Sequence, residues 1–502
     1  MNNYDLVVIG TGAGNTILEA ALTQGLKCAV IERGKFGGTC LNRGCTPTKV
    51  LAAAADNIIQ IKNARTLGIK SSDYNIDWNI ISNNVWNKIN NNKELLSYFD
   101  EFDNLDIYQG TASFVDNTAI KVVFNDDGEE ELIKGEKIFI NVGGRTKIPD
   151  FEGLEDIDYV TSESFFGYKW PEKPYENLII LGGGPIGVEF AHIFSAFGGN
   201  VSIVQHNIRL LPKEDEEISK ALAEHFEERG INLYLNQDTV AVHDRDGIKH
   251  LKIKNRSTGE EKILTGETVF VTPGIMSNGD SLNLENTSIK TDSRGFIETN
   301  EFLETSVPGI WALGDVNGNA AFRHKANYEA EIIAHNLFYK KNSKDLRWAS
   351  YDLVPAVTFS SPQVAHIGLT EAQAIKMGYD IQIGYHHYYQ TVKGYAMGFR
   401  ESQKSKNFAK AVVEKKSKKI LGLHIIGPEA SILIQPFVNL MNAGHRVLKP
   451  LNAAIEHEMS QRARSDKTER YLDPAVISTV LETMSPHPAL SEIPAWIGWF
   501  LE

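Results

Sequence analysis

GGTCLNRGCTPTK, residues Gly37 to Lys49, is the stretch that decides how the rest of the sequence is interpreted, because it holds two of the chain's three cysteines. Cys40 and Cys45 are separated by LNRG, with a glycine pair before them and a proline after, which predicts an irregular loop leading into a helix near Lys49. A reactive thiolate needs a lowered pKa, which a helix N-terminus or a nearby cation supplies, and Arg43 and Lys49 are candidate cations. The pair is therefore predicted to be a redox-active dithiol.

Two other uses of these thiols fit the sequence less well. A zinc site needs more ligands, yet no second cysteine pair exists and Cys28 stands alone in a predicted strand. A structural disulfide between Cys40 and Cys45 would close a very short loop and add little chain-entropy stabilisation. Three cysteines in 502 residues are also no secreted disulfide framework, so we expect no metal ligands and a reducing, cytoplasmic location.

The bulk composition describes an ordinary globular protein. A length of 502 residues is enough for about three domains of the usual size. The formal net charge of −13 argues against nucleic acid or an anionic membrane as the main partner. No signal-peptide pattern and no long charge-free apolar run are found, so we expect no membrane segment.

The N-terminal residues predict a nucleotide-binding βαβ unit. DLVVIGTGAGNTILEAALTQG, Asp5–Gly25, indicates a buried strand, a glycine turn and a helix, and the next strand ends in Glu32. Gly10 and Gly12 occupy the first two glycine positions, but Asn15 stands at the third. A lone motif of this kind would also fit a glycine turn in another α/β protein.

A second unit of the same kind begins at Asn177. NLIILGGGPIGVEFAHIFSAFGGNVSIVQH has the complete triplet Gly182, Gly184 and Gly187, whereas Gln205 stands at the position of the acid. Two such units imply two dinucleotides on one chain, a combination typical of a flavin that exchanges electrons with a nicotinamide.

Further motifs appear in a fixed order along the chain. GTASFVD covers Gly110–Asp116, and ALGD ends in Asp315, which could bind a ribityl hydroxyl or cap the next helix. VPAVTFSSPQVAHIGLTEAQA covers Val354–Ala374, and HPALSE covers His487–Glu492. Together with Gly37–Lys49, these motifs resemble the class I pyridine nucleotide-disulfide oxidoreductases, which include dihydrolipoyl dehydrogenase and the glutathione, mycothione and mercuric reductases.

The resemblance covers nearly the whole chain and implies its architecture. The expected α/β fold has two Rossmann-like dinucleotide-binding domains and a C-terminal α+β dimerisation domain. We expect an FAD-binding domain at 1–150, an NAD(P)-binding domain at 151–274, an FAD-binding return segment at 275–347 and the dimerisation domain at 348–502. Members of this family are homodimers with a shared active site.

The resemblance also implies catalytic roles. Cys45 would be the charge-transfer thiol beside the flavin, and Cys40 the interchange thiol that meets the substrate sulfur. His487, supplied by the partner subunit, would be the acid–base for Cys40, and Glu492 would orient its ring. The physical logic agrees, because a leaving thiolate must be protonated and a histidine held by a carboxylate does this near neutral pH.

The cofactors implied are FAD and either NAD or NADP. Glu32 would bind the adenosine ribose of FAD, Asp315 its ribitol, and Lys49 would pair with Glu189 beside the flavin. The expected cofactor-binding residues are Gly10, Gly12, Gly14, Glu32, Gly38, Thr39, Lys49, Ala112, Gly143, Gly182, Gly184, Gly187, Glu189, Gln205, Gly274 and Asp315.

The substrate is expected to be a small-molecule or lipoyl-bound disulfide or dithiol. The first hypothesis is a dihydrolipoyl dehydrogenase using NAD, with a 2-oxoacid dehydrogenase complex as a candidate partner. The alternative is an NADPH-dependent reductase of a low-molecular-weight disulfide, because Gln205 removes an acid that would repel a 2′-phosphate, and His206 or Arg209 could favour one. Mercuric reductases add a C-terminal cysteine pair, but no cysteine follows Cys45.

Two departures from the family pattern concern the site. Arg43 occupies a position that is usually apolar and could stabilise a thiolate or attract an anion. An extra segment around Ser460–Val480, with a charge-rich start that predicts a solvated surface, leads into His487 and is expected to reshape the substrate entrance.

Overall fold

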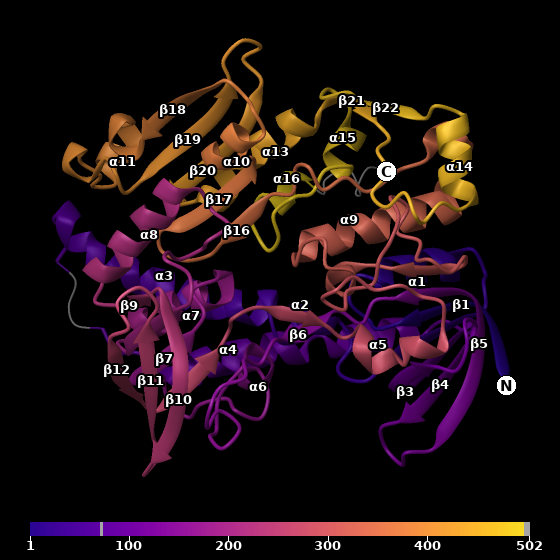
Figure 1. Ribbon diagram of the computed structural model, residues 1–502, viewed down its shortest axis with the longest axis horizontal. Helices are drawn as coiled ribbons and strands as arrows, with labels where there is room; N and C mark the ends of the chain where they lie inside the picture. The colour runs from indigo at the N-terminus through magenta and orange to yellow at the C-terminus, as the bar shows by residue number, and fades with distance from the viewer. Residues whose placement is uncertain (71–73, 496–502) are drawn as a thin grey trace.

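The computed structural model describes residues 1–70 and 74–495. Its first sheet is built mainly from the N-terminal third of the chain and is completed by one strand from much later (Figure 1). The six strands are β1 (Asn2–Ile9), β2 (Cys28–Glu32), β3 (Leu105–Phe114), β4 (Ala119–Phe124), β5 (Glu130–Ile140) and β15 (Ile310–Ala312). β1 pairs in parallel with β2 and β5, and Leu6–Ile9 is at most 3% exposed, as expected for a strand covered on both faces.

The second sheet repeats the parallel part of this plan between residues 177 and 271. β13 (Thr268–Val271), β7 (Asn177–Leu181), β8 (Asn200–Gln205) and β9 (Asn232–Leu235) are parallel and lie in that order. Helix α7 (Pro185–Ala196) is almost entirely buried beside β7. A separate antiparallel sheet follows, made of β10 (Gln237–Arg245), β11 (Ile248–Asn255) and β12 (Glu261–Gly266).

The third main sheet is antiparallel and lies in the C-terminal region. Its order is β16 (Ala356–Thr358), β17 (Gln363–Gly368), β20 (Ile420–Gly427), β19 (Phe408–Glu414) and β18 (Ile381–His387). The short helices α12 (Ala430–Leu433) and α13 (Gln435–Asn442) place Ala430, Ile434 and Val438 against its buried residues. This apolar face explains why the sheet and these helices form one layer pair.

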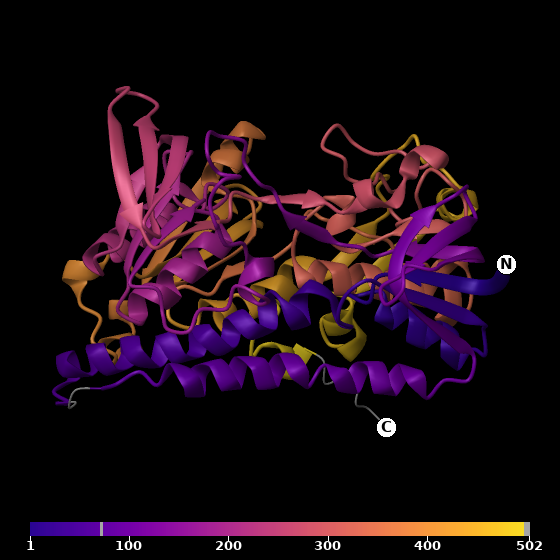
Figure 2. The ribbon, with the colours of Figure 1, turned by 90° about the horizontal axis from the view of Figure 1, so that it is seen from below.

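A long helix connects the cysteine loop to the rest of the molecule. α3 (Cys45–Ala64) begins at the second cysteine and contacts both α7 and α4 (Trp78–Asn90). Figure 2 shows α3 in indigo beside the purple helices α4 and α5 (Lys93–Asp100) along one side of the molecule. The redox loop is therefore fixed by a helix that packs on the NAD(P) region.

The C-terminal segment crosses back over the FAD-binding half. It contains β21 (Gly444–Val447), α14 (Glu458–Ser465), β22 (Glu469–Leu472), α15 (Ile477–Leu481) and α16 (Glu492–Ala495). We call residues 444–482 the C-terminal strap. Figure 1 shows β21, β22 and α14 in yellow near α9 (Arg323–Ala334), away from the orange sheet β16–β20.

The expected fold class is confirmed. A largely parallel sheet and a fully parallel sheet each carry a glycine turn after a buried strand, and an antiparallel sheet with helices closes the chain. Within the described ranges, no helix is both long and apolar enough to cross a bilayer.

Candidate active site

A single cavity of about 350 Å³ joins the first glycine turn to the cysteine pair. Its walls come from the elements around the first sheet, from α7 and from the C-terminal region. The expected site residues that line it are Gly10, Gly12, Glu32, Gly38, Thr39, Cys40, Cys45, Lys49, Ala112, Gly143, Glu189, Asp315 and His487.

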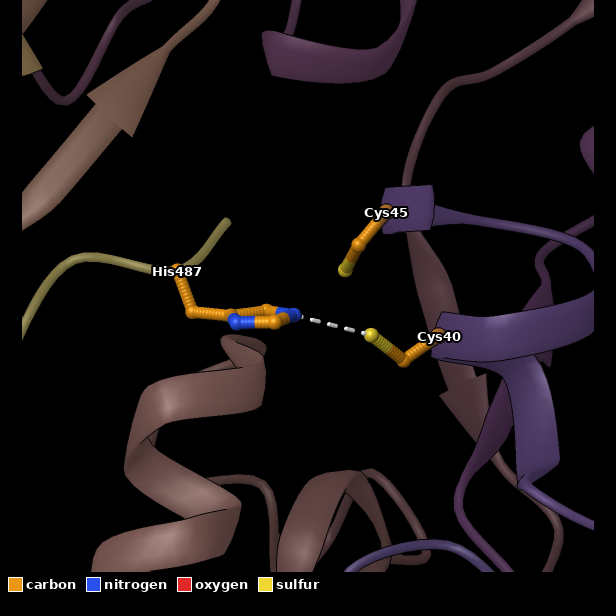
Figure 3. Close-up of side chains that lie close together, drawn as sticks. All are labelled: Cys40, Cys45 and His487. Carbon is orange, nitrogen blue, oxygen red and sulfur yellow. Dashed lines mark hydrogen bonds between the residues drawn. The ribbon is translucent and has the colours of Figure 1, made fainter. Parts of the chain in front are cut away.

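The two cysteines face one another across the start of α3. Cys40 lies in α2 (Gly38–Asn42) and is 6% exposed, while Cys45 is the first residue of α3, and both are free thiols. Figure 3 shows both sulfur atoms directed toward the imidazole of His487, whose Nε2 lies 3.2 Å from the Cys40 Sγ. The structure therefore brings together the expected interchange thiol, its neighbour and the expected acid–base.

The two thiols differ in the direction in which their pKa values are shifted. A hydrogen bond from Cys45 lowers the pKa of Cys40 against the opposing effect of burial, and the charges of Arg323 and Lys49 act in the same direction as that bond. The same hydrogen bond, together with burial, raises the pKa of Cys45 well above its ordinary value. The two shifts have opposite directions because the two thiols share one hydrogen bond.

His487 is held from its other side by a carboxylate. Its Nδ1 lies 2.5 Å from Glu492 Oε1, and the second oxygen of Glu492 accepts a hydrogen bond from Ala489 N at 3.2 Å. A carboxylate on Nδ1 keeps the proton there, so the lone pair of Nε2 is directed at Cys40. This geometry suits proton transfer to and from sulfur.

The imidazole beside Cys40 belongs to the same chain. The strap brings this histidine to the cavity mouth. A histidine from the partner subunit, which the resemblance implied, stays a prediction.

A half-buried ion pair joins three regions on the other side of the cavity. Lys49 Nζ lies 2.7 Å from Glu189 Oε2, and Glu189 Oε1 accepts a hydrogen bond from Phe359 N at 2.9 Å. The ammonium also lies 4.5 Å from the centre of the Phe359 ring. Lys49 comes from α3, Glu189 from α7 and Phe359 from the C-terminal region, so the pair fixes how these regions meet.

The first glycine turn is closed by Glu32. This buried carboxylate accepts hydrogen bonds from Thr11 N at 2.9 Å and Thr11 Oγ1 at 2.7 Å, and its other oxygen accepts from Gly34 N at 2.8 Å. Asn15 Nδ2 donates to Thr11 O at 3.0 Å, while its buried Oδ1 has no hydrogen-bond partner within the described chain. Asn15 Oδ1 therefore remains available at this turn as a hydrogen-bond acceptor.

The cavity wall fits FAD. A Cβ on Gly38, whose φ is +61°, would lie 3.0 Å from Gly12 Cα, so only glycines permit this close approach of backbone to a pyrophosphate. Glu32 could accept from a ribose hydroxyl at one end. Asp315, in η4 (Gly314–Asn317), lines the wall farther along and has a pKa raised by burial, so it gains from a ribityl hydroxyl partner.

The second glycine turn lies at the carboxyl end of β7. A Cβ on Gly187 would lie 2.0 Å from Gly182 O, so the third glycine is required by packing of α7 on the turn. Gln205 Oε1 accepts from Gly183 N at 3.0 Å, and its Nε2 donates to Arg209 O at 3.3 Å. Six of the expected cofactor-binding residues do not line the cavity with the thiols, and they are Gly14, Gly182, Gly184, Gly187, Gln205 and Gly274.

The sequence analysis missed several residues of the cavity. Arg323 opens α9 and acts on Cys40 by its charge, yet no motif marks it. Arg43 forms an ion pair with Glu163, in α6 (Ser162–Phe165), so its charge is already partnered. Asn141 packs under the first turn, where a Cβ on Gly12 would lie 3.1 Å from its Nδ2. Of these three residues, only Arg43 was singled out in the sequence analysis, as a charge at a usually apolar position.

The thiols and His487 also form a ligand set. Among the described residues, one ligand atom from each of Cys40, Cys45 and His487 lies within 4.8 Å of the others. Two thiolates and an imidazole suit a soft metal ion. The resemblance had already placed these three residues together as catalytic groups, while the sequence analysis expected no metal ligands.

Comparisons with known proteins agree on one family. Residues 4–330 match the pyridine nucleotide-disulphide oxidoreductase family, and residues 354–455 match its dimerisation domain. The chain is 32% identical over 450 residues to a mycothione reductase of Mycobacterium tuberculosis, covering 88% of this chain and 94% of that protein. It is 30% identical over 501 residues to a dihydrolipoyl dehydrogenase of Zymomonas mobilis, covering 98% and 96%.

A solved structure shares the fold. The Cu(II) complex of the HOCl-induced flavoprotein disulfide reductase RclA from Escherichia coli superposes with a TM-score of 0.75 over 100% of both chains. Its sequence identity is 24%, so this likeness concerns the fold alone.

Proposed function

The chain belongs to the pyridine nucleotide-disulphide oxidoreductase family, and we propose that within it the protein oxidises a dihydrolipoyl group with NAD through Cys40 and Cys45. The protein is an FAD-dependent disulfide oxidoreductase that uses a pyridine nucleotide, as its family does. The observation that carries the proposal is the Cys40–His487–Glu492 relay with Cys45 beside it.

The proposed reaction begins with Cys40 and Cys45 joined as a disulfide. His487 Nε2 takes the proton of one lipoyl thiol, and the resulting thiolate attacks the Cys40 sulfur, so that Cys45 leaves as a thiolate. The second lipoyl thiol then attacks the lipoyl sulfur of this mixed disulfide, while its proton passes through His487 Nε2 to the leaving Cys40 sulfur. The cyclic disulfide is released, with one proton on His487, one on Cys40 and the thiolate on Cys45. Two electrons then reside on the cysteine pair.

Three side chains have defined tasks in this proposed reaction. Glu492 holds the proton on Nδ1 and stabilises the imidazolium that forms when Nε2 is protonated. Lys49 and Glu189 fix the position of α7 against α3 and keep a charge pair at the cavity wall. Bound FAD supplies the two-electron transfer between the cysteine pair and the nicotinamide.

The burial of Cys40 favours a lipoyl substrate. The sulfur atom belongs to a residue that is only 6% exposed, so a substrate must reach it on a slim arm. A dithiolane on an aliphatic chain meets this requirement better than a bulky peptide disulfide. A 2-oxoacid dehydrogenase complex is then the partner that would present the protein-bound lipoyl group.

A second candidate is an NADPH-dependent reductase of a low-molecular-weight disulfide. The observation that favours it is Gln205, a neutral amide at the strand end where an acid would repel a 2′-phosphate. His206 is exposed next to it and could approach such a phosphate. The mycothione reductase named above supports this candidate at a similar level of identity.

Steady-state kinetics test both candidates. Dihydrolipoamide with NAD, and NADH or NADPH with lipoamide and a set of small disulfides, give the ranking of kcat/KM values. We expect dihydrolipoamide with NAD to rank first. A higher kcat/KM for a small disulfide with NADPH, with negligible lipoamide turnover, would replace the first candidate by the second.

Variants of the cysteines test the site itself. Cys40→Ser is expected to abolish disulfide exchange while FAD binding is unchanged. The matched control is Cys28→Ala, which removes a buried thiol in β2 that lies outside the cavity and is expected to keep full activity. Unchanged turnover in Cys40→Ser would refute the proposed role of the thiol.

A further inference from the structure

A lysine and a glutamate of α9 form a fully buried ion pair behind the cavity wall. Lys325 and Glu329 lie one helical turn apart with their charged groups at 3.1 Å, and both side chains are 0% exposed. Neither belongs to the described residues that line the cavity. Taking two charges out of water is unfavourable, so a buried pair is tolerated only where further hydrogen bonds satisfy both groups. The partners of this pair therefore indicate what it holds.

The pair holds the peptide units on both sides of Gly314. Gly314 N donates to Glu329 Oε2 at 2.7 Å, and Gly314 O accepts from Lys325 Nζ at 2.9 Å. Gly314 has a φ of +76°, a left-handed conformation that glycine adopts without strain. The carbonyl of Gly314 belongs to the same peptide unit as the N–H of Asp315. The bond from Lys325 consequently fixes the direction in which the chain continues into Asp315.

Asn317 connects the other end of this turn, η4, to the same pair. Its Oδ1 accepts from Lys325 Nζ at 2.6 Å, and its Nδ2 donates to Glu329 Oε1 at 2.8 Å. Tyr351 OH also donates to Glu329 Oε1. The third bond of the ammonium goes to Glu329 Oε2 at 3.1 Å, so all three of its protons have acceptors. A buried polar network that is satisfied in this way holds the turn in one arrangement.

The turn places Asp315 in the cavity wall beside the start of α9. Four residues of η4 and α9 line the cavity together, and they are Gly314, Asp315, Arg323 and Ala326. Burial raises the pKa of Asp315, while the charge of Lys325 opposes this shift and that of Glu329 adds to it. Because the two charges act in opposite directions, the pair affects the position of Asp315 more than its charge state.

We propose that Lys325 and Glu329 are positioning residues of the flavin site, which act through Asp315. The pair fixes the turn that presents Asp315 to the cavity, and it ties that turn to the first residues of α9. Bound FAD then meets two wall segments that keep a constant relative position. This role depends on the expected contact of Asp315 with the ribityl chain, and it is independent of which disulfide and which nicotinamide nucleotide the protein uses.

A paired substitution removes both charges together. Lys325→Met with Glu329→Gln avoids leaving one charge buried alone, and the new amide can still accept from Gly314 N. We expect the dissociation constant of FAD to rise about tenfold, because Gly314 O loses its donor and the turn is held less firmly. Release of FAD from the holoprotein on dilution, followed by flavin fluorescence, measures this constant. An unchanged constant in the folded variant would overturn the proposed role.

Asp315→Ala tests whether the pair acts through this carboxylate. Alone, it is expected to weaken FAD binding about 30-fold, since the partner of a ribityl hydroxyl is lost. In the Asp315→Ala background, the paired substitution should change the dissociation constant by no more than about twofold, because the turn has no side chain left to position. A further tenfold loss in this background would overturn the role of the pair. Unchanged FAD affinity in Asp315→Ala itself would refute the flavin contact of Asp315, and with it any action of the pair through that residue.

The reduction potential of the flavin is a second readout. Reduced flavin carries more negative charge than oxidised flavin, and the N-terminal turn of α9, with Arg323, is a positive end beside the cavity. In a Cys40→Ser and Cys45→Ser background, which removes the disulfide couple, we expect the paired substitution to lower the midpoint potential by about 30 mV. This shift corresponds to a loss of affinity that is tenfold larger for reduced than for oxidised flavin. Equilibration with a redox dye measures it.

The matched control is another buried ion pair. Lys410 in β19 lies 2.9 Å from Asp215, the residue before α8 (Glu216–Glu228), and their side chains are 1% and 3% exposed. Neither belongs to the described residues that line the cavity. Lys410→Met with Asp215→Asn should lower the unfolding temperature but leave the FAD affinity and the potential unchanged. An equal loss of FAD affinity in both paired variants would overturn the specific role of Lys325 and Glu329.

Tyr351→Phe is the milder variant for the case that the paired substitution does not fold. It keeps both charges and removes only the hydroxyl that donates to Glu329 Oε1. We expect FAD affinity to fall about threefold, and this loss should disappear in the Asp315→Ala background. In that case, either an unchanged affinity in Tyr351→Phe or a loss that persists without Asp315 would overturn the role of the pair.

Discussion

The two glycine turns of this chain follow the same strand–turn–helix course, but different contacts hold each turn in place. In the second turn, Gly187 is forced by contact, since its Cβ would lie 2.0 Å from Gly182 O. In the first turn, Asn15 occupies the equivalent position and donates to Thr11 O at 3.0 Å. In the first turn, tight packing is found one residue earlier, at Gly14, where an added Cβ would lie 2.9 Å from Val8 Cγ1. A missing glycine in a motif therefore does not mean a missing turn.

The residues at the strand ends differ in charge but share a task. Glu32 and Gln205 each accept a hydrogen bond from a backbone N–H of the turn, at 2.9 Å and 3.0 Å. Glu32 adds a negative charge that favours ribose hydroxyls, whereas Gln205 is neutral and donates its amide N–H to Arg209 O. The backbone task explains why both are polar and buried, and of the two only Glu32 offers a charge that a ribose diol could meet.

The largest effect is expected from a substitution that forces a side chain into the second turn. Gly187→Ala places a methyl group on Gly182 O, so α7 must move away from β7 at a cost of about 3 kcal/mol. We expect a lower unfolding temperature and loss of nicotinamide nucleotide binding, with FAD retained. Calorimetry and nucleotide titration measure both.

The matched control for this prediction is Gly184→Ala. No atom lies within 4 Å of the Cβ position on Gly184, and the φ of −79° suits any residue. Stability should therefore be unchanged. Equal destabilisation by both variants would show that the crowding at Gly187 is not the cause.

The second prediction makes the first turn resemble the second at its strand end. Glu32→Gln keeps the shape and the hydrogen bond from Thr11 N but removes the charge and the acceptor for Gly34 N. We expect FAD affinity to fall about tenfold, because a hydrogen bond to a charged group contributes about 1 kcal/mol more than a neutral one. Flavin release on dilution, followed by fluorescence, measures the affinity, and nicotinamide binding is the internal control. Unchanged flavin affinity would mean that the ribose does not meet this carboxylate.

Much of the fold followed from patterns with a local cause. Buried apolar runs such as Leu6–Ile9, each followed by glycines, predicted the parallel strands at the centre of the first two sheets, because these strands are covered on both faces. The loop with Cys40 and Cys45 was predicted to run into a helix, and α3 begins at Cys45. Lys49 and Glu189, expected to pair, lie 2.7 Å apart.

The route of the strap could not be predicted from local patterns. Its charge-rich start was expected to be solvated, yet Arg464 pairs with the buried Glu301 and Arg470 with Glu482. Glu301 is 163 positions away in sequence (464 minus 301), so only the assembled structure shows which arginines face inward. Arg323 was missed for the same reason, because its effect on Cys40 depends on where α9 begins.

The third prediction gives the second turn the charge of the first. Gln205→Glu should keep the hydrogen bond from Gly183 N while offering a carboxylate to a ribose diol. The ratio of kcat/KM with NAD to that with NADP is expected to rise about tenfold, since the new charge attracts ribose hydroxyls and repels a 2′-phosphate. The conservative control is Gln205→Asn, which adds no charge. An unchanged ratio in Gln205→Glu would place the adenosine ribose away from this side chain.

The smallest expected effect concerns the third position of the first turn. Asn15→Gly restores the complete glycine triplet, and if the motif alone set stability, the variant would be at least as stable as the parent. We expect the reverse, a loss of about 1 kcal/mol, because the bond from Asn15 Nδ2 to Thr11 O disappears and the first residue of α1 (Asn15–Thr23) becomes a glycine. Flavin affinity should stay within about twofold, since Glu32 and the turn backbone are untouched. Thermal unfolding beside flavin titration measures both quantities, and a more stable Asn15→Gly variant would mean that the two turns close by the same packing after all.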